Sequence, residues 1–90
     1  MKFPIGTTIV FEDKVFDFRD ELEIKAYVVT DAGEIKYLVH DQKSEYDCMF
    51  MIMSERELDD EIEEKEKYEG KKCYFKTKYG IRRRNERIEV

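Results

Sequence analysis

The C-terminal end of the chain, KKCYFKTKYGIRRRNERIEV, holds the residue types best suited to binding chemistry. Lysines and arginines alternate there with aromatic residues, and grooves for single-stranded nucleic acid combine cations that contact phosphates with rings that stack on bases. The segment 71–87 is therefore a candidate binding region for nucleic acid or another acidic partner. Its candidate contact residues are Lys76, Lys78, Tyr79, Arg82, Arg83, Arg84 and Arg87.

A strongly acidic segment comes immediately before this basic end. Residues 54–69 hold nine acids and three bases, a net charge of -6, whereas residues 71–90 hold eight bases and two acids, a net charge of +6. Opposite charges on neighbouring segments predict pairing within the protein or between copies, and such pairs steer partner choice more than they add affinity. The candidate contact residues of the acidic segment are Glu57, Asp60, Glu61 and Glu64.

Several hypotheses for these charges name different partners. Charge pairing within the protein or its oligomer is favoured, followed by a protein partner, because residues 1–70 have a net charge of -11 and would repel a polyanion. In the nucleic-acid alternative, the segment 71–87 binds phosphates and its affinity falls steeply with salt. In a further alternative, the segment 54–69 mimics DNA and inhibits a DNA-binding protein, without affinity for nucleic acid itself.

No combination of residues in the sequence predicts catalysis. His40 is the only histidine, and Asp41 beside it is thin support for a catalytic pair, so a surface or strand-end position is the favoured interpretation. The sequence has no phosphate loop and no GxSxG, HExxH or EF-hand pattern. The carboxylates at 59–64 would point in different directions around a helix, which favours a solvated face. We expect a protein that is not an enzyme and uses no cofactor, metal or small-molecule substrate.

Size and composition predict one cytoplasmic domain over residues 1–90. The chain is 41% hydrophobic and 13% aromatic, which argues against disorder although 43% of its residues are charged. Its longest apolar run, CMFMIM at 48–53, is far shorter than the ~20 residues of a membrane helix, and the N-terminus lacks the apolar core of a secretion signal. Cys48 and Cys73 lack metal-ligand spacing, and we expect both to be reduced and core-facing.

Alternating and β-branched residues predict the strands in the first half of the chain. Residues 7–12 are the first expected strand, and residues 15–18 are either a short strand or an irregular return. The clearest hairpin runs from 23 to 41, with its turn at the sequence DAGE. One face of each arm carries the apolar residues of this hairpin: Ile24, Ala26 and Val28 on the first arm, and Ile35, Tyr37 and Val39 on the second.

The apolar run CMFMIM and the residues after it predict a buried strand followed by an exposed helix. The run is apolar on both faces, which is typical of a buried strand, with its methionines as core packing and not as metal ligands. Residues 54–69 predict a helix, because Ser54 and Glu57 form a capping box and Gly70 suits the C-terminal turn. Its main apolar contacts, Leu58 and Ile62, form a narrow stripe, with Tyr68 as a possible third member.

The basic end predicts a second hairpin. Its arms are 73–78 and 81–88, with the turn at Tyr79 and Gly80. Cys73, Phe75 and Thr77 share one face of the first arm. The second arm has few apolar residues, so we expect it to be an edge strand whose charges discourage unwanted strand pairing.

The stretches IGTTIVFED, AYVVTDAGEIKYLVHD and MFMIMSEREL together resemble the small SH3-like barrel proteins of bacteria and phages. The resemblance covers the rhythm of residues 5–60. This chain has Ala26 where the family's hairpin often has glycine, and the short turn after the apolar strand is extended here into a charged helix. The resemblance implies a binding or adaptor role and carries no active-site residue to this chain.

Taken together, these patterns predict a mainly β domain of the β-rich α+β class. We expect a small SH3-like, curled antiparallel barrel with one exposed acidic helix at about 54–69 and a C-terminal hairpin. The expected function is that of a non-enzymatic protein-binding adaptor or regulator, encoded by a phage or mobile element, that acts through the acidic helix and the basic hairpin.

Overall fold

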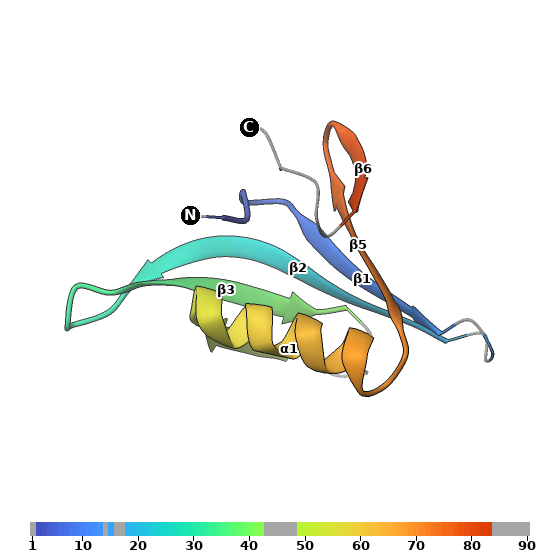
Figure 1. Cartoon of the computed structure of the whole chain (residues 1–90). Coiled ribbons are helices and arrows are strands. Elements are labelled where there is room, and N and C mark those ends of the chain that lie inside the picture. Colours follow the sequence, from blue (N-terminus) through green and yellow to red (C-terminus); the bar gives the residue numbers. More distant parts are fainter. Residues whose placement is uncertain (1, 14, 16–17, 43–48, 84–90) are drawn as a thin grey trace.

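The computed structural model describes residues 2–13, 15, 18–42 and 49–83 of the chain. Within these residues the elements are β1 (Thr8–Asp13), β2 (Phe18–Val29), β3 (Ile35–Asp41), β4 (Phe50–Met53), α1 (Glu55–Lys67), β5 (Lys72–Thr77) and β6 (Gly80–Arg83). The strands form one antiparallel sheet in the order β4-β3-β2-β1-β5-β6, and α1 packs against one face of it (Figure 1). The predicted mainly β domain with one helix is confirmed. Closure of the sheet into an SH3-like barrel stays a prediction.

The first three strands form a continuous antiparallel meander. Asp13 at the end of β1 lies opposite Phe18 at the start of β2. Of the segment predicted as a short strand or an irregular return, residues 16 and 17 lie outside the described part. The predicted β2–β3 hairpin is confirmed. Its turn is closed by the Gly33 N–H, which donates to the carbonyl of Thr30 at 2.9 Å, and Gly33 has a φ of 81°, a conformation that favours glycine.

A β-bulge in β2 changes which side chains face the core. Ile24 lies opposite Val39, whereas Tyr27 lies opposite Tyr37, so β2 contains one residue more than β3 between these two pairs. Because strict alternation is interrupted at the bulge, Tyr27 lies on the core side and its ring contacts that of Tyr37, with 5.7 Å between the ring centroids. The predicted face shared by Ile24, Ala26 and Val28 is therefore wrong for Ile24, which faces the core, whereas Ala26 and Val28 lie together on the other face.

The apolar run at 48–53 is not a buried strand, contrary to the prediction. Its described part forms β4, which lies at one edge of the sheet and pairs with β3. Met51 and Met53 pack against the core, whereas Phe50 and Ile52 are 48% and 55% exposed. The prediction failed because hydrophobic periodicity shows that both faces of a strand are apolar, but not whether another strand lies beside it.

Helix α1 begins where its capping signals predict. The Glu57 N–H donates to the Ser54 Oγ at 3.1 Å, and the Ser54 N–H donates to the Glu57 Oε1 at 3.3 Å, which completes the predicted capping box. Gly70 follows the helix with a φ of 64°, as its predicted role at the C-terminal turn requires. In the part of the chain that the structure describes, no helix is long and apolar enough to cross a membrane.

β5 returns to the sheet beside β1 and begins the predicted terminal hairpin. Cys73 and Phe75 are buried on its core face, as predicted. The turn lies at Lys78 and Tyr79, one residue before the predicted Tyr79 and Gly80, because Gly80 already pairs with Thr77 as the first residue of β6. As predicted, β6 forms an edge of the sheet. The rest of the predicted second arm, and Cys48, lie outside the described residues.

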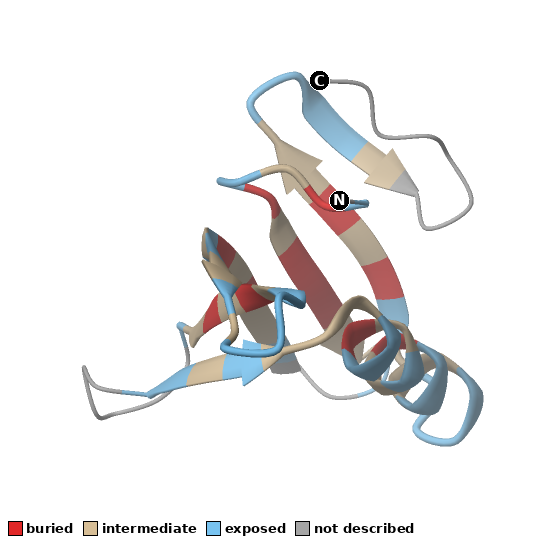
Figure 2. Ribbon diagram, turned by 90° about the vertical axis from the view of Figure 1, so that its left-hand side faces the viewer, coloured by how far each residue is buried: buried red, intermediate tan, exposed pale blue. Residues whose placement is uncertain are grey.

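The core lies between the sheet and α1 and is completed by the N-terminal segment (Figure 2). Phe3 is fully buried, and its ring meets those of Tyr37 and Phe75 edge to face, with centroid separations of 5.7 and 5.3 Å. From α1, only the predicted Leu58 and Ile62 are buried, and Tyr68 is 78% exposed, so its predicted core contact is wrong. The other members of this core are Ile9, Phe11, Leu22, Ile24, Val39 and Cys73.

We predict that Phe3→Ala lowers the free energy of unfolding by about 3–5 kcal/mol, because the substitution leaves a cavity between α1 and the sheet. Urea unfolding followed by circular dichroism measures this change. Ile5→Ala in the same segment is the matched control, because Ile5 is 57% exposed and its truncation should cost less than about 1 kcal/mol. Equal, small losses in both variants would show that Phe3 does not complete the core.

Candidate interaction surfaces

Four acidic side chains form a strip along the exposed face of α1. Their separations of three and four residues place helical side chains next to one another. Glu57, Asp60 and Glu64 are exposed, and Glu61 is half-buried with its Oε1 3.8 Å from the Nζ of Lys65. The four predicted acidic contact residues thus share one surface, which we call the acidic strip: Glu57, Asp60, Glu61 and Glu64.

Like charges within the acidic strip oppose the stability of the helix that carries it. Glu57 with Glu61 and Asp60 with Glu64 are like charges four residues apart, and each such pair destabilises a helix by roughly 0.2–0.5 kcal/mol. Beside the strip lies a shallow hollow of about 330 Å³, lined by Asp60, Glu63, Glu64 and Tyr68. The exposed ring of Tyr68, which was a possible third apolar contact of the helix, therefore belongs to the acidic surface.

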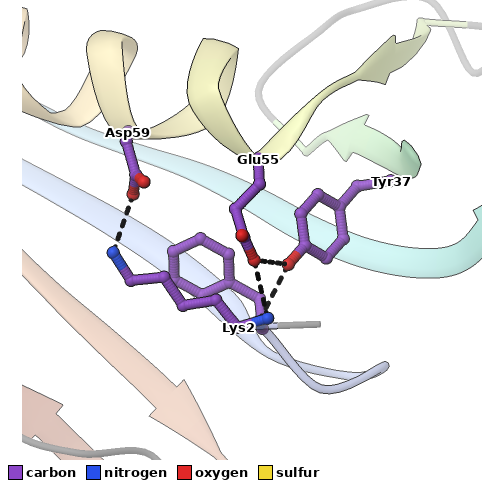
Figure 3. Close-up of polar contacts among 5 residues, drawn as sticks. Lys2, Tyr37, Glu55 and Asp59 are labelled. Carbon is purple, nitrogen blue, oxygen red and sulfur yellow. Dashed lines mark hydrogen bonds and ion pairs between the residues drawn. The ribbon is translucent and has the colours of Figure 1, made fainter. Parts of the chain in front are cut away.

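A hydrogen-bond network fixes the first turn of α1 to the sheet and to the N-terminal segment (Figure 3). The Tyr37 hydroxyl donates to the Glu55 Oε1 at 2.8 Å and accepts the Phe3 N–H at 3.0 Å. The Lys2 N–H donates to the same Glu55 oxygen at 2.7 Å, and the Lys2 Nζ lies 2.9 Å from the Asp59 Oδ1. The orientation of the acidic strip therefore depends on a tyrosine of β3 and on residues 2 and 3.

The two titratable groups at the centre of this network have pKa values shifted in opposite directions. The hydrogen bond from Tyr37, followed by that from the Lys2 N–H, holds the pKa of Glu55 below its usual range. Burial, with a smaller effect of the neighbouring Glu55 carboxylate, raises the pKa of Tyr37 well above its usual value. Glu55 is therefore ionised and Tyr37 neutral at pH 7, which is the state that their hydrogen bond requires.

The basic hairpin, defined as β5, β6 and the turn between them, carries the predicted cations toward its tip. The Lys76 Nζ lies 3.7 Å from the Glu21 Oε1 of β2. The Lys78 Nζ lies 5.1 Å from the ring centroid of Tyr79, whose side chain is exposed at the turn. The Arg82 Nη1 donates to the carbonyl of Ile81 at 3.1 Å. A cation next to an exposed ring is thus present at the tip.

The remaining predicted basic residues fall at or beyond the end of this hairpin. Arg83 is the last residue of β6 and lies opposite Tyr74 of β5. Arg84 and Arg87 lie outside the described residues. The structure therefore brings Lys76, Lys78, Tyr79, Arg82 and Arg83 together on one hairpin.

The acidic strip and the tip of the basic hairpin are far apart. Figures 1 and 2 place α1 and the β5–β6 turn toward opposite ends of the molecule. Of the described acids of α1, Glu61 pairs with Lys65 within the helix and Asp59 pairs with Lys2. Among the residues that the structure describes, no ion pair joins the acidic strip to Lys76, Lys78 or Arg82. The predicted pairing of the two charged segments occurs where they adjoin, since the Lys71 Nζ lies 3.3 Å from the Glu69 Oε1, but among the described residues it does not extend to the acidic strip and the hairpin tip.

An apolar surface on β3 and β4 was not predicted from the sequence. Phe50 and Ile52 are exposed there, and the ring of Phe50 lies 4.7 Å from that of His40, which faces it across the strand pair. Ile52 lies opposite Leu38 in the same way. His40 is thus a half-buried strand residue beside an aromatic ring. The shortness of the apolar run was the one sequence signal of an edge position.

Searches of protein families, curated proteins and solved structures found no match to this chain. Within residues 2–13, 15, 18–42 and 49–83, no three His, Cys, Asp or Glu side chains are grouped so that they could hold a metal ion. The candidate surfaces are therefore defined by the geometry of this chain alone.

We predict that the Tyr37–Glu55 network makes folding stability depend on pH at both extremes. Because the pKa of Glu55 is lowered by folding, its contribution is present above the usual carboxyl pKa of about 4.3 and is lost as pH falls through the lower folded value. Because the pKa of Tyr37 is raised, its contribution is present below the usual tyrosine pKa of about 10 and is lost as pH rises from there toward the folded value.

Urea unfolding at a series of pH values measures both losses. Glu55→Gln should flatten the acid limb of the stability profile, and Tyr37→Phe should flatten the alkaline limb. Glu34→Gln is the control for the acid limb, because Glu34 is exposed in the β2–β3 turn. An acid limb that is as steep in Glu55→Gln as in Glu34→Gln would contradict the assigned role of Glu55.

Proposed function

We propose that the protein is a cytoplasmic, non-enzymatic protein-binding adaptor or regulator that contacts its partners through the acidic strip and the basic hairpin. The observation that carries this proposal is the separation of the two surfaces: the described part of the chain contains no ion pair between them, although they are adjacent in sequence and opposite in charge. Each surface therefore remains available to a partner of the opposite charge.

The chemistry of each surface indicates the kind of protein it would bind. A partner of the acidic strip would present lysines or arginines, and an arginine could also stack on the exposed ring of Tyr68 beside the strip. A partner of the basic hairpin would present carboxylates, with Tyr79 as its aromatic contact. Charge complementarity would set orientation and association rate, while the exposed tyrosines would supply contact area.

Nucleic-acid binding is a second candidate function, favoured by one observation. The Lys78 ammonium lies beside the exposed ring of Tyr79 at the hairpin tip, and this pairing of cation and ring suits phosphate contact with base stacking. The acidic strip weighs against it, because residues outside 71–90 carry a net charge of -11, the difference between -5 and +6, and would repel a polyanion. Protein binding is therefore the preferred function.

We predict that reversing either surface removes specific partners. Asp60→Lys with Glu64→Lys reverses the acidic strip and leaves the capping residue Glu57 intact; Lys78→Glu with Arg82→Glu reverses the hairpin. The amount of each protein that the wild type captures from lysate should fall at least about tenfold with the corresponding variant. The physical reason is that like charges across an interface cost several kcal/mol. Quantitative mass spectrometry of immobilised wild-type and variant proteins measures this ratio.

Two controls make the result specific. Asp31→Lys with Glu34→Lys produces the same change of charge as the acidic-strip variant, but in the exposed β2–β3 turn, away from both surfaces, and should capture the wild-type set of partners. Nuclease treatment of the lysate should leave the capture unchanged. Capture that all three variants share equally would contradict a role for these surfaces, and capture abolished by nuclease would favour the nucleic-acid function.

A further inference from the structure

The two edges of the sheet differ in how they are protected against strand pairing. β6 carries Arg82 and Arg83, and charged side chains on an edge discourage pairing with another strand. β4, with the sequence FMIM, contains no charge and no proline. Within the described residues, β4 pairs on one side only, with β3. One edge of this sheet therefore has the features of a pairing surface and the other does not.

β4 is complementary to a second copy of itself. In an antiparallel pair, residues directly opposite each other lie on the same face of the sheet. If Met51 lies opposite Met51 of the second copy, Phe50 of each copy lies opposite Ile52 of the other on the outer face. Aromatic and β-branched residues form favourable cross-strand pairs, and this register creates two of them with no charged residue opposed.

We propose that a second copy of this chain docks on β4 by antiparallel β4–β4 pairing, which joins the two sheets into one. The pairing is isologous, because the same edge is used by both copies, and so it closes at the dimer. If β4 paired instead with β6 of another copy, a free β4 edge would remain at one end of the pair and a free β6 edge at the other. Further copies could then add to both ends without limit. The absence of charge on β4 and the arginines on β6 favour the closed arrangement.

The outer-face neighbours on β3 extend this interface. Phe50 lies opposite His40, and Ile52 lies opposite Leu38. In the proposed register, His40 and Phe50 of one copy therefore continue into Ile52 and Leu38 of the other copy as one row on the outer face. The contact between Phe50 and Ile52 in the middle of this row joins the two copies, and the two-fold symmetry repeats the row. The contact between the His40 and Phe50 rings, 4.7 Å between centroids, holds Phe50 in a defined position for this pairing.

The size of the surface indicates a concentration-dependent dimer. Phe50 is 48% exposed, which corresponds to roughly 70–120 Å² if an aromatic side chain buries about 150–250 Å² in total. Ile52 and Met49 add two more exposed side chains on each copy. The apolar area that each copy offers is therefore below the roughly 800 Å² per partner of a standard stable interface. The dimer should therefore form in the range of about 10 μM to 1 mM, and the chain should be monomeric below it.

Sedimentation velocity over a concentration series tests this proposal, with each variant first shown by circular dichroism to be folded. The wild type should shift from monomer to dimer and no further. Ile52→Lys should remain monomeric at every concentration, because it places a charge opposite Phe50 of the second copy. Ile81→Lys is the matched control: Ile81 is 60% exposed on β6, and this variant should dimerise like the wild type.

A double variant tests the register. Phe50→Lys alone and Ile52→Glu alone should both weaken the dimer, whereas Phe50→Lys with Ile52→Glu places opposite charges across the symmetry axis and should restore it. A wild type that stays monomeric up to about 1 mM, oligomers larger than a dimer, or Ile52→Lys and Ile81→Lys behaving alike would overturn the proposal. Failure of the double variant to recover dimerisation would overturn the register. None of these outcomes depends on the partners of the acidic strip or the basic hairpin.

Discussion

The hydrogen bond from the Tyr37 hydroxyl to the Glu55 carboxylate joins three parts of the molecule that are distant in sequence. Tyr37 comes from β3, Glu55 begins α1, and the same hydroxyl accepts the N–H of Phe3. The carbonyl of Phe3 in turn accepts the hydroxyl of Tyr27 at 2.7 Å, so the buried backbone of the N-terminal segment is satisfied on both sides. Because α1 buries only Leu58 and Ile62, this polar network sets the position of the helix on the sheet.

That position leaves the acidic face of α1 exposed. A helix with a two-residue buried stripe leaves most of its circumference to solvent or to a partner, and nothing in the packing of α1 requires four carboxylates on one face. The basic hairpin could have neutralised them, yet the sheet order places β6 at the far edge from β4, where α1 begins. The fold thereby converts charges that are adjacent in sequence into two separate surfaces.

Features that depend on local sequence were predictable. The capping box at Ser54 and Glu57, the hairpin turn at Gly33 and the spacing of the acidic strip all follow from interactions within a few residues. The four predicted acids share a face because helical periodicity alone determines it. The predicted basic residues of the hairpin also come together through local structure, because a two-residue turn places its two arms side by side.

Features that depend on distant contacts were not predictable. The bulge in β2 changes the facing residues by one position, and nothing in the local pattern of residues 24–28 marks it. The edge position of β4 depends on which strands assemble beside it, so Phe50 and Ile52 were assigned to the interior. Phe3 completes the core only because β5 pairs with β1 and brings Phe75 next to it. The distance between the two charged surfaces likewise depends on the order in which distant strands pair in the sheet.

The separation of these charges is the central claim, and a double-mutant cycle tests it directly. The free energy of unfolding is measured in dilute solution for the wild type, for Asp60→Lys with Glu64→Lys, for Lys78→Glu with Arg82→Glu, and for all four substitutions together. Separate surfaces predict that the two changes add to within about 0.5 kcal/mol. A coupling energy above about 1 kcal/mol would show that the acidic strip and the basic hairpin neutralise each other within one molecule, which would contradict this account.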